Sequence, residues 1–207
     1  MSTSGRARED VRQPVDRRVS RTRRSIDDAF LALLQRSGYD AVGVSDIVRE
    51  ADVGRATFYE HYTSKDELLR TQLRRVAAST LRARPDLPEL FDATPLFAHV
   101  RDVPLLYRLV AGRSAAARSL RIQHEVLEER AGTLLLEHVR GGASLPLPLT
   151  PPIAARVIVA SLCTLLAWWT EHGMAASAGE MQRLLAACTA PMLAGSAATS
   201  RSAAGNL

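Results

Sequence analysis

Residues 54–65 of the chain read Gly-Arg-Ala-Thr-Phe-Tyr-Glu-His-Tyr-Thr-Ser-Lys. At 3.6 residues per turn, Phe58 and Tyr62 fall one turn apart on the same side of a helix. The stretch therefore predicts a short helix with a buried aromatic stripe and a polar exposed face. The side chains predicted on that exposed face are Arg55, Thr57, Tyr59 and His61.

Two further helices are predicted upstream of this stretch. Apolar residues recur at helical spacing in the first, at Ile26, Ala29, Phe30, Leu33 and Leu34. Gly38 is placed to end that helix, and a shorter helix is expected to begin near Val44. Asp52 stands in the following turn where a left-handed residue is wanted, which aspartate tolerates better than most residues. Two short helices joined by such a turn form a helix-turn-helix.

The rest of the chain is predicted to be helical, because helix-start and helix-stop residues punctuate it and no strand pattern of any length occurs. A capping box of Ser64 and Glu67 opens a long helix that runs to Pro85. Further helices are expected from Thr94, from Asp102 to Gly112, from Ser114 to Gly141, from Thr150 to Gly173, and from a capping box at Ser177 and Glu180 to Pro191. The sequence therefore predicts an all-α fold.

Basic charge is concentrated near the N-terminus. The formal net charge is +5, and arginine supplies 26 of the 27 basic residues. Residues 1–25 hold eight arginines against three acidic residues, whereas residues 20–66 hold seven basic and eight acidic residues. Because the first 19 residues have few apolar side chains, they are predicted to form a flexible arm. Two interpretations of the arm stay open: a solvated tail, or a segment that contacts DNA phosphates or a narrow A·T minor groove.

Other classes of protein are disfavoured. The five histidines form no HExxH motif and no i, i+4 pair, and there is no GxSxG motif, so no catalytic residue, metal ligand or cofactor is predicted. Cys163 and Cys188 lack metal or CxxC spacing, which suits a cytoplasmic protein, and a redox role for them stays open. The longest apolar run, residues 157–169, is shorter than the roughly 20 residues that span a bilayer, so no membrane partner is expected.

The segment Thr57-Phe58-Tyr59-Glu60-His61-Tyr62-Thr63-Ser64-Lys65-Asp66-Glu67-Leu68-Leu69, with the helix order before it, closely resembles the DNA-binding head of TetR-type transcriptional regulators. The resemblance is specific over residues 20–70. It implies a sequence-specific homodimeric repressor, in some members an activator, that binds double-stranded DNA at a pseudo-palindromic operator. It also implies a helical second half that binds a small-molecule effector. A DNA-binding or nucleoid-organising protein without small-molecule control is the alternative.

The resemblance predicts four parts of the chain. These are a flexible arginine-rich arm at 1–19, a helix-turn-helix DNA-binding domain at 20–66, a helical ligand-binding and dimerisation domain at 67–194, and a disordered tail at 195–207.

Carried onto matching positions, the resemblance implies base-facing roles for Arg55, Thr57 and Tyr59. It implies phosphate contacts for Tyr59, His61 and Lys65, and the predicted DNA-binding set is completed by Gly54 and Ser45. Arginine can bind a guanine edge bidentately, and hydroxyl, imidazole and ammonium groups donate to phosphate oxygens.

Three positions depart from the family pattern. Gly43 stands where many members have a capping threonine, Asp52 where they have glycine, and Gly54 where they often have serine or threonine. Two possible hydroxyl contacts to phosphate, at Gly43 and Gly54, are therefore missing, and the arginine-rich arm is a candidate source of compensating contacts.

The effector pocket is expected among the helices at 66–84, 94–112, 114–140 and 151–172. Its candidate lining residues are Phe97, Tyr107, Gln123, His124 and Trp168, with ordinary core packing as the alternative for each. The surrounding Leu, Ala and Val residues favour an apolar or aromatic ligand.

The helices at 151–172 and 177–193 are expected to form a four-helix bundle with a second copy of the chain. The alternative is that they form only the core of one subunit. The small and apolar residues that permit close approach there are Ala160, Ser161, Leu162, Leu165, Leu184, Leu185, Ala187 and Cys188.

Overall fold

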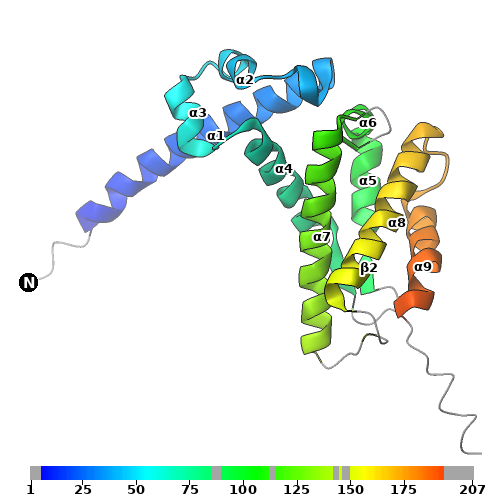
Figure 1. The fold of residues 1–207 in the computed structure, drawn as a ribbon. Helices are drawn as coiled ribbons and strands as arrows, with labels where there is room; N and C mark the ends of the chain where they lie inside the picture. The colour runs from blue at the N-terminus through cyan, green and yellow to red at the C-terminus, as the bar shows by residue number, and fades with distance from the viewer. Residues whose placement is uncertain (1–5, 85–89, 112–114, 142–144, 146–149, 194–207) are drawn as a thin grey trace, which may run out of the picture. The chain divides into compact units, whose positions relative to one another are not determined.

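The computed structural model describes residues 6–84, 90–111, 115–141, 145 and 150–193 (Figure 1). The chain divides into two compact units, residues 1–69 and 70–207. The division falls inside α4 (Lys65–Thr80), which contributes residues to both units. The predicted tail at 195–207 lies outside the described residues.

The first unit contains α1 (Arg6–Ala41), α2 (Val44–Glu50), α3 (Arg55–His61) and the start of α4. α1 is interrupted at Gly38, whose φ of 75° and ψ of 171° suit a residue without a Cβ. The predicted helix stop at Gly38 is therefore confirmed. Asp52, in the turn between α2 and α3, has a φ of 52°, so the left-handed residue predicted there is confirmed as well.

The N-terminal extension of α1 differs from the prediction. α1 begins at Arg6, so residues 6–19 are helical where the sequence predicted a flexible arm. Arginine, glutamate and glutamine have good helix propensity, so a segment rich in them can continue an established helix. The prediction rested on the lack of apolar residues, which says little about backbone conformation next to an established helix.

The core of the first unit is formed by one face of each of its helices. Its fully buried members include Ile26, Phe30, Leu34, Ile47, Phe58 and Leu68. Burying a side chain of this kind stabilises the fold by about 1.5–3 kcal/mol. Because Phe58 is among them, the orientation of α3 is fixed by the core beneath it.

The second unit contains the rest of α4 and the helices α5 to α9. Their bounds are α5 (Thr94–Asp102), α6 (Pro104–Ala111), α7 (Ala117–Arg140), α8 (Pro151–Glu171) and α9 (Ala178–Leu193). α8 packs against α6, α7 and α9, and α9 also packs against α5. The core at one end of α8 includes Trp169, whose ring meets that of Phe97 edge to face at a centroid distance of 5.7 Å.

A short antiparallel ribbon precedes α5. It consists of β1 (Arg82–Arg84) and β2 (Leu90–Asp92), with Arg82 opposite Asp92 and Arg84 opposite Leu90. The sequence predicted no strand, so this is a correction. Strands of three residues are too short for apolar and polar residues to show a recognisable alternation. The all-α fold class with an N-terminal helix-turn-helix is otherwise confirmed.

The predicted caps account for two helix starts. The Ser177 N–H donates to Glu180 Oε2 at 2.6 Å, and the Glu180 N–H donates to Ser177 Oγ at 3.2 Å, which is a complete capping box. At the start of α4, the Glu67 N–H donates to Ser64 Oγ at 3.1 Å. α9 continues to Leu193, two residues beyond its predicted end at Pro191.

In the part of the chain that the structure describes, α8 is the one helix long and apolar enough to cross a membrane by length and composition. One face of α8 is buried in the second unit, and its buried residues include Ala154, Ile158, Leu162 and Leu166. Because this face packs against α6, α7 and α9, α8 has the place of a core helix.

Candidate nucleic-acid interface and effector cavity

α3 presents the polar face that its sequence predicts. Phe58 and Tyr62 are buried, whereas Tyr59 is 54% exposed. Arg55 is also exposed, and Thr57 is half-buried, as is His61. The Phe58 ring meets the Tyr59 ring edge to face at 5.4 Å between centroids, so the buried ring supports the exposed one.

Arg55 and Ser45 are brought together by the helix-turn-helix. The Arg55 guanidinium donates a hydrogen bond to Ser45 Oγ, which joins the start of α3 to the start of α2. A guanidinium carries five N–H donors, so most of them remain for a base edge or a phosphate. The bond holds the long Arg55 side chain in one direction, which lowers the entropy it would lose on binding.

Lys65 is held at the first turn of α4. Its Nζ donates to the Tyr39 carbonyl oxygen at 2.8 Å and lies 4.1 Å from the centroid of the Tyr39 ring. The Tyr39 hydroxyl in turn donates to the Asp66 carboxylate. Lys65, predicted as a phosphate contact, therefore also ties α4 to the end of α1.

A buried polar network that the sequence did not reveal fixes the end of α3. The Tyr62 hydroxyl donates to Asp27 Oδ1 at 2.5 Å and accepts from Arg23 Nε at 3.1 Å. Asp27 is buried, and burial of the Tyr62 ring, followed by its hydrogen bond to Asp27, raises the pKa of Tyr62. The available signal was an aspartate next to Ile26, on the side of α1 that carries the apolar stripe.

Gly43 is the N-cap residue of α2 but has no side chain to cap the helix. The carboxylate of Asp46, in the first turn of α2, accepts a hydrogen bond at this helix end instead. The Gly43 N–H donates to Asp46 Oδ2 at 3.0 Å, and Arg49 donates to Asp46 Oδ1 at 2.7 Å. The hydrogen bond from Gly43, and to a smaller extent that from Arg49, lowers the pKa of Asp46. A Cβ at position 43 would lie 3.3 Å from Asp46 Oδ2, so the glycine leaves room for this carboxylate. At Gly54 the nearest atom to such a Cβ is Thr57 Oγ1 at 3.8 Å, and the site is open.

Two of the five candidate effector residues line a common cavity. Tyr107 and Gln123 face a cavity of about 10 Å³ whose other walls are apolar: Leu73, Val76, Ala77, Leu96, Leu127 and Leu166. Gln123 is only 3% exposed. Among the described residues, the one fully buried side-chain nitrogen or oxygen without a hydrogen-bond partner is Gln72 Nε2, which does not line this cavity. Burial raises the pKa of Tyr107, and Cys163 adds to the shift, so the hydroxyl stays protonated.

The other three candidates lie apart from this cavity lining. Phe97 packs against Trp169, and His124 is half-buried on α7. Trp168 is 48% exposed and stacks on His172 at 4.9 Å between centroids. The tryptophan that faces the core is thus Trp169, one position further along α8.

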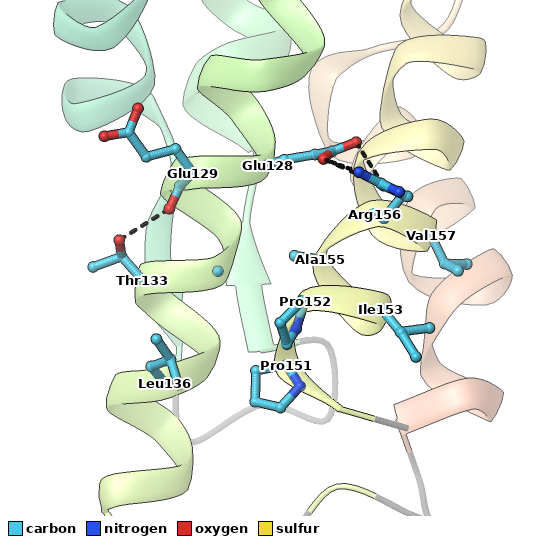
Figure 2. A pocket seen from close by; sticks show the side chains of 11 residues that line it. Glu128, Glu129, Thr133, Leu136, Pro151, Pro152, Ile153, Ala155, Arg156 and Val157 are labelled. Carbon is cyan, nitrogen blue, oxygen red and sulfur yellow. Dashed lines mark hydrogen bonds and ion pairs between the residues drawn. The ribbon is translucent and has the colours of Figure 1, made fainter. Parts of the chain in front are cut away.

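A larger groove lies between α7 and the first turns of α8, with a volume of about 470 Å³ (Figure 2). Figure 2 shows the Glu128–Arg156 pair at one end and Pro151 with Pro152 at the other. The paired atoms, Arg156 Nε and Glu128 Oε1, are 3.4 Å apart. A Cβ on Gly132 would meet nothing within 4 Å, so the floor of the groove is open. None of the five candidate effector residues lines this groove.

α8 and α9 expose apolar side chains that could contact a second copy. Leu162 and Leu185, two of the predicted interface residues, are instead buried within the unit. The exposed apolar residues of the two helices are Ile153, Val157, Ala160, Trp168, Leu184, Ala187 and Cys188.

Clusters of three or more histidine, cysteine, aspartate or glutamate residues that could hold a metal ion are absent from the described part of the chain.

Comparisons of sequence agree on the head. The family model for bacterial regulatory proteins of the tetR family matches residues 26–72. Over 68 residues, 32% of this chain, the sequence is 44% identical to the uncharacterized HTH-type transcriptional regulator YxbF of Bacillus subtilis (strain 168). Over 48 residues, 23% of this chain, it is 40% identical to DhaS, the HTH-type dhaKLM operon transcriptional activator of Lactococcus lactis subsp. lactis (strain IL1403). The matches span only 18% of YxbF and 26% of DhaS.

Comparison of structures extends the likeness over most of the chain. The full-length native TylP, a TetR regulator from Streptomyces fradiae, superposes with a TM-score of 0.61 and 25% sequence identity. The superposition covers 83% of this chain and 81% of TylP. The head and the helical second unit therefore occur in the same order in both proteins. The family model thus matches the helix-turn-helix head to the tetR family of bacterial regulatory proteins, and the chain as a whole shares the fold of TylP.

Proposed function

We propose that the chain is a TetR-family transcriptional regulator, and that it is a ligand-responsive homodimeric repressor that acts in the cytoplasm on a pseudo-palindromic operator. The observation that supports it most is the exposed face of α3, where Arg55, held by Ser45, stands beside Tyr59 on a buried aromatic anchor. Side chains pre-positioned on a helix are suited to reading base edges in a major groove. Thr57 and His61 extend the same face, and Lys65 and Gly54 flank it.

Genome-wide footprinting of the purified protein tests this proposal. We expect discrete sites that share a palindrome, since a two-fold dimer presents one α3 to each half-site. Arg55→Gln should weaken operator binding by about 1–3 kcal/mol per half-site and relax the preference at one base. Arg36→Gln is the matched control, because Arg36 pairs with Glu50 on the surface of the same unit. Diffuse binding without a shared palindrome would contradict a sequence-specific regulator.

Dimerisation is supported by the exposed apolar residues of α8 and α9. Trp168 and Leu184 are each nearly half exposed, and they are among several exposed apolar residues on two helices that pack against each other, which is typical of an interaction surface. A face of this kind on two adjacent helices can pack against its own copy around a two-fold axis.

An effector site is supported at the Tyr107 and Gln123 cavity. The Gln123 amide and the Tyr107 hydroxyl can form hydrogen bonds with a polar group of a ligand that lies between the apolar walls. The space is small, so binding requires the surrounding leucines to move apart. The apolar walls favour an apolar or aromatic ligand with one or two hydrogen-bonding groups.

Effector control requires differential affinity for the free and the operator-bound protein. A 100-fold loss of operator affinity needs a coupling free energy of about 2.7 kcal/mol between the two sites. Bound operator must then lower the affinity for the effector by the same factor. Titration of a compound that releases the operator, with and without operator DNA, measures both sides of this relation. Equal affinity in the two titrations would contradict it.

Transcriptional activation is the second candidate, favoured by one observation: DhaS, whose head is 40% identical over 48 residues, is named an activator. A reporter gene placed downstream of a footprinted site distinguishes repression from activation. Deleting the regulator should raise expression from a repressed promoter and lower it from an activated one.

A further inference from the structure

The N-terminal part of α1 extends beyond the helix-turn-helix of its own unit. Arg23 Nε bonds the Tyr62 hydroxyl at 3.1 Å, so α1 passes the end of α3 near Arg23. At 1.5 Å per residue, Arg17 lies about 9 Å and Arg6 about 25 Å further along the helix axis. Figure 1 shows this blue end of α1 running out past α2 and α3. Residues 6–22 are called the arm helix below.

The described side chains of the arm helix are almost all in solvent. Residues 17–21 are exposed, including the apolar Val19, and the first fully buried side chain of α1 among the described ones is that of Ile26. A helix whose side chains lie in solvent gains little from packing, and a short one is marginal in water. A partner that binds its side chains would therefore stabilise it.

Three arginines cluster on the arm helix. Arg17 and Arg21 are four residues apart, and Arg18 and Arg21 are three apart, so Arg21 is a surface neighbour of both. None of the three makes a hydrogen bond or an ion pair within the part of the chain that the structure describes. Like charges at these spacings oppose helix formation. Three neighbouring arginines that have no ion-pair partner among the described residues favour a multiply charged anion as the ligand of the arm helix.

The charge of the rest of the head supports the same partner. Residues 20–66 hold seven basic and eight acidic residues, so the helix-turn-helix has no net attraction for phosphate. Residues 1–25 hold eight arginines and three acidic residues, an excess equal to the net charge of +5 of the whole chain. In proteins that bind nucleic acid, the non-specific part of affinity scales with the phosphates neutralised.

We propose that the arm helix lies against the DNA backbone flanking each half-site, with Arg17, Arg18 and Arg21 bonded to phosphates, and supplies most of the salt-dependent affinity. This inference rests on the proposed operator binding. It assigns two tasks to two parts of the unit: α3 selects the sequence, and the arm helix attracts the backbone.

The test compares two triple variants of the full-length protein on one footprinted operator fragment. The arm variant is Arg17→Gln, Arg18→Gln and Arg21→Gln. The control, Arg108→Gln, Arg121→Gln and Arg140→Gln, removes the same charge from exposed arginines of the second unit. Operator affinity is measured over a series of KCl concentrations for both variants and the wild type.

We expect the arm variant to flatten the dependence of log K on log salt by about 0.9 for each phosphate that is no longer neutralised, or roughly 5 for two heads. The control variant should keep the wild-type slope. A third variant with lysine at positions 17, 18 and 21 should restore the slope, because it keeps the charge. Far-ultraviolet circular dichroism checks that each variant retains a folded core.

Two contrary results are distinguishable. If the wild type shows no discrete sites, the proposed function fails and this inference fails with it. If the wild type binds its operator and the arm and control variants have equal slopes, the arm helix does not contact phosphate and this inference alone is overturned. Removal of residues 1–18 gives a second readout, since hydroxyl-radical protection should then retreat from both outer edges of the site.

Discussion

Asp52 occupies the left-handed region with a φ of 52°, in the turn that sets the angle between α2 and α3. A residue with a Cβ is strained there, although aspartate is strained less than most. Because Asp52 is exposed, its substitution changes the backbone preference without removing buried contacts. The effect of a substitution at Asp52 on stability should therefore depend mainly on the backbone preference of the new residue.

Asp52→Gly should raise the unfolding free energy of the head by up to about 1 kcal/mol, whereas Asp52→Val should lower it by about 1–2 kcal/mol. Glycine relieves the strain but adds entropy to the unfolded chain, so its gain is the smaller effect. Urea unfolding followed by circular dichroism measures both. A valine variant as stable as the wild type would show that the turn adopts another conformation in solution.

Tyr62→Phe should destabilise the head by about 1–3 kcal/mol, since it leaves the buried Asp27 carboxylate without this donor. The pH dependence is specific. Burial, then the bond to Asp27, raises the pKa of Tyr62 above its ordinary 10.0, so folding favours the protonated phenol. The resulting stability is present below about pH 10 and is lost as pH rises through the folded pKa. Urea unfolding at neutral pH and at about pH 11 should show a larger loss for the wild type than for the Phe variant.

Gln123→Leu should leave the stability of the unliganded protein within about 1 kcal/mol of the wild type, because Gln123 is 3% exposed and leucine fits the apolar lining of the cavity beside it. Gln182→Leu is the matched control and should destabilise it. Gln182 Oε1 accepts from the Ala93 N–H and Gln182 Nε2 donates to the Phe91 carbonyl, both at 2.9 Å. Thermal unfolding of the two variants decides the matter, and a destabilised Gln123 variant would argue against a ligand site there.

At the scale of elements, the helix starts depend on a few carboxylates and hydroxyls. The capping box of α9 is the clearest case, because both of its reciprocal hydrogen bonds are present. The hydrogen bond from the Ser177 backbone N–H, and to a smaller extent that from the Ser177 side chain, lowers the pKa of Glu180 below its ordinary 4.5. The stability that this carboxylate supplies is therefore present above about pH 4.5 and is lost as pH falls through the folded pKa.

Ser177→Ala should lower the unfolding free energy of the second unit by about 1 kcal/mol. Glu180→Gln should also be destabilising at neutral pH, and its difference from the wild type should shrink as the pH is taken from about 5 to about 3. Urea unfolding at several pH values follows both variants. A Gln variant that stays equally destabilised in acid would show that the Glu180 charge is not the cause.

Sequence reasoning was most successful where one local signal decides an element. Gly38 and Asp52 mark backbone conformations that few residues adopt, and both positions were predicted. The β1–β2 ribbon was missed because strands of three residues are too short to show a pattern. The helical residues 6–19 were missed because the valines at 11, 15 and 19, although at helical spacing, stand among few other apolar residues. In the second unit, both tryptophans of α8 lie in one apolar run, and only packing shows that Trp169 rather than Trp168 faces the core. Asp27 was missed because its partner, Tyr62, is 35 residues away.

At the scale of the whole molecule, the proposed dimer depends on the exposed residues of α8 and α9. Trp168→Glu with Leu184→Glu should convert the dimer into a monomer, because each charge would be buried in the interface. Leu105→Glu is the control, since Leu105 is 53% exposed on α6 and should leave the dimer intact. Analytical ultracentrifugation gives the mass of each variant, and a monomeric wild type would contradict the proposed dimer.

The two thiols provide an independent probe of the same surface. Burial, then the Glu128 charge, raises the pKa of Cys163 to about 12, so this thiol should react slowly with iodoacetamide at mildly alkaline pH. Cys188 is exposed in one copy of the chain and lies on the proposed interface. Its labelling rate should rise when the protein is diluted below the dimer dissociation constant. A rate independent of concentration would place Cys188 outside the interface.

α4 would act as a lever if it moves as one rigid helix. It contains neither glycine nor proline between Lys65 and Thr80, and helices seldom kink without such a residue. Its 16 residues extend about 24 Å, so a tilt of about 5° at one end displaces the other by about 2 Å. That displacement exceeds the roughly 0.5 Å range of N–H···O distances within which a hydrogen bond to a base edge survives. In the proposed regulator, a stiff helix of this length would allow a small rearrangement at one end to break a hydrogen bond to the operator at the other.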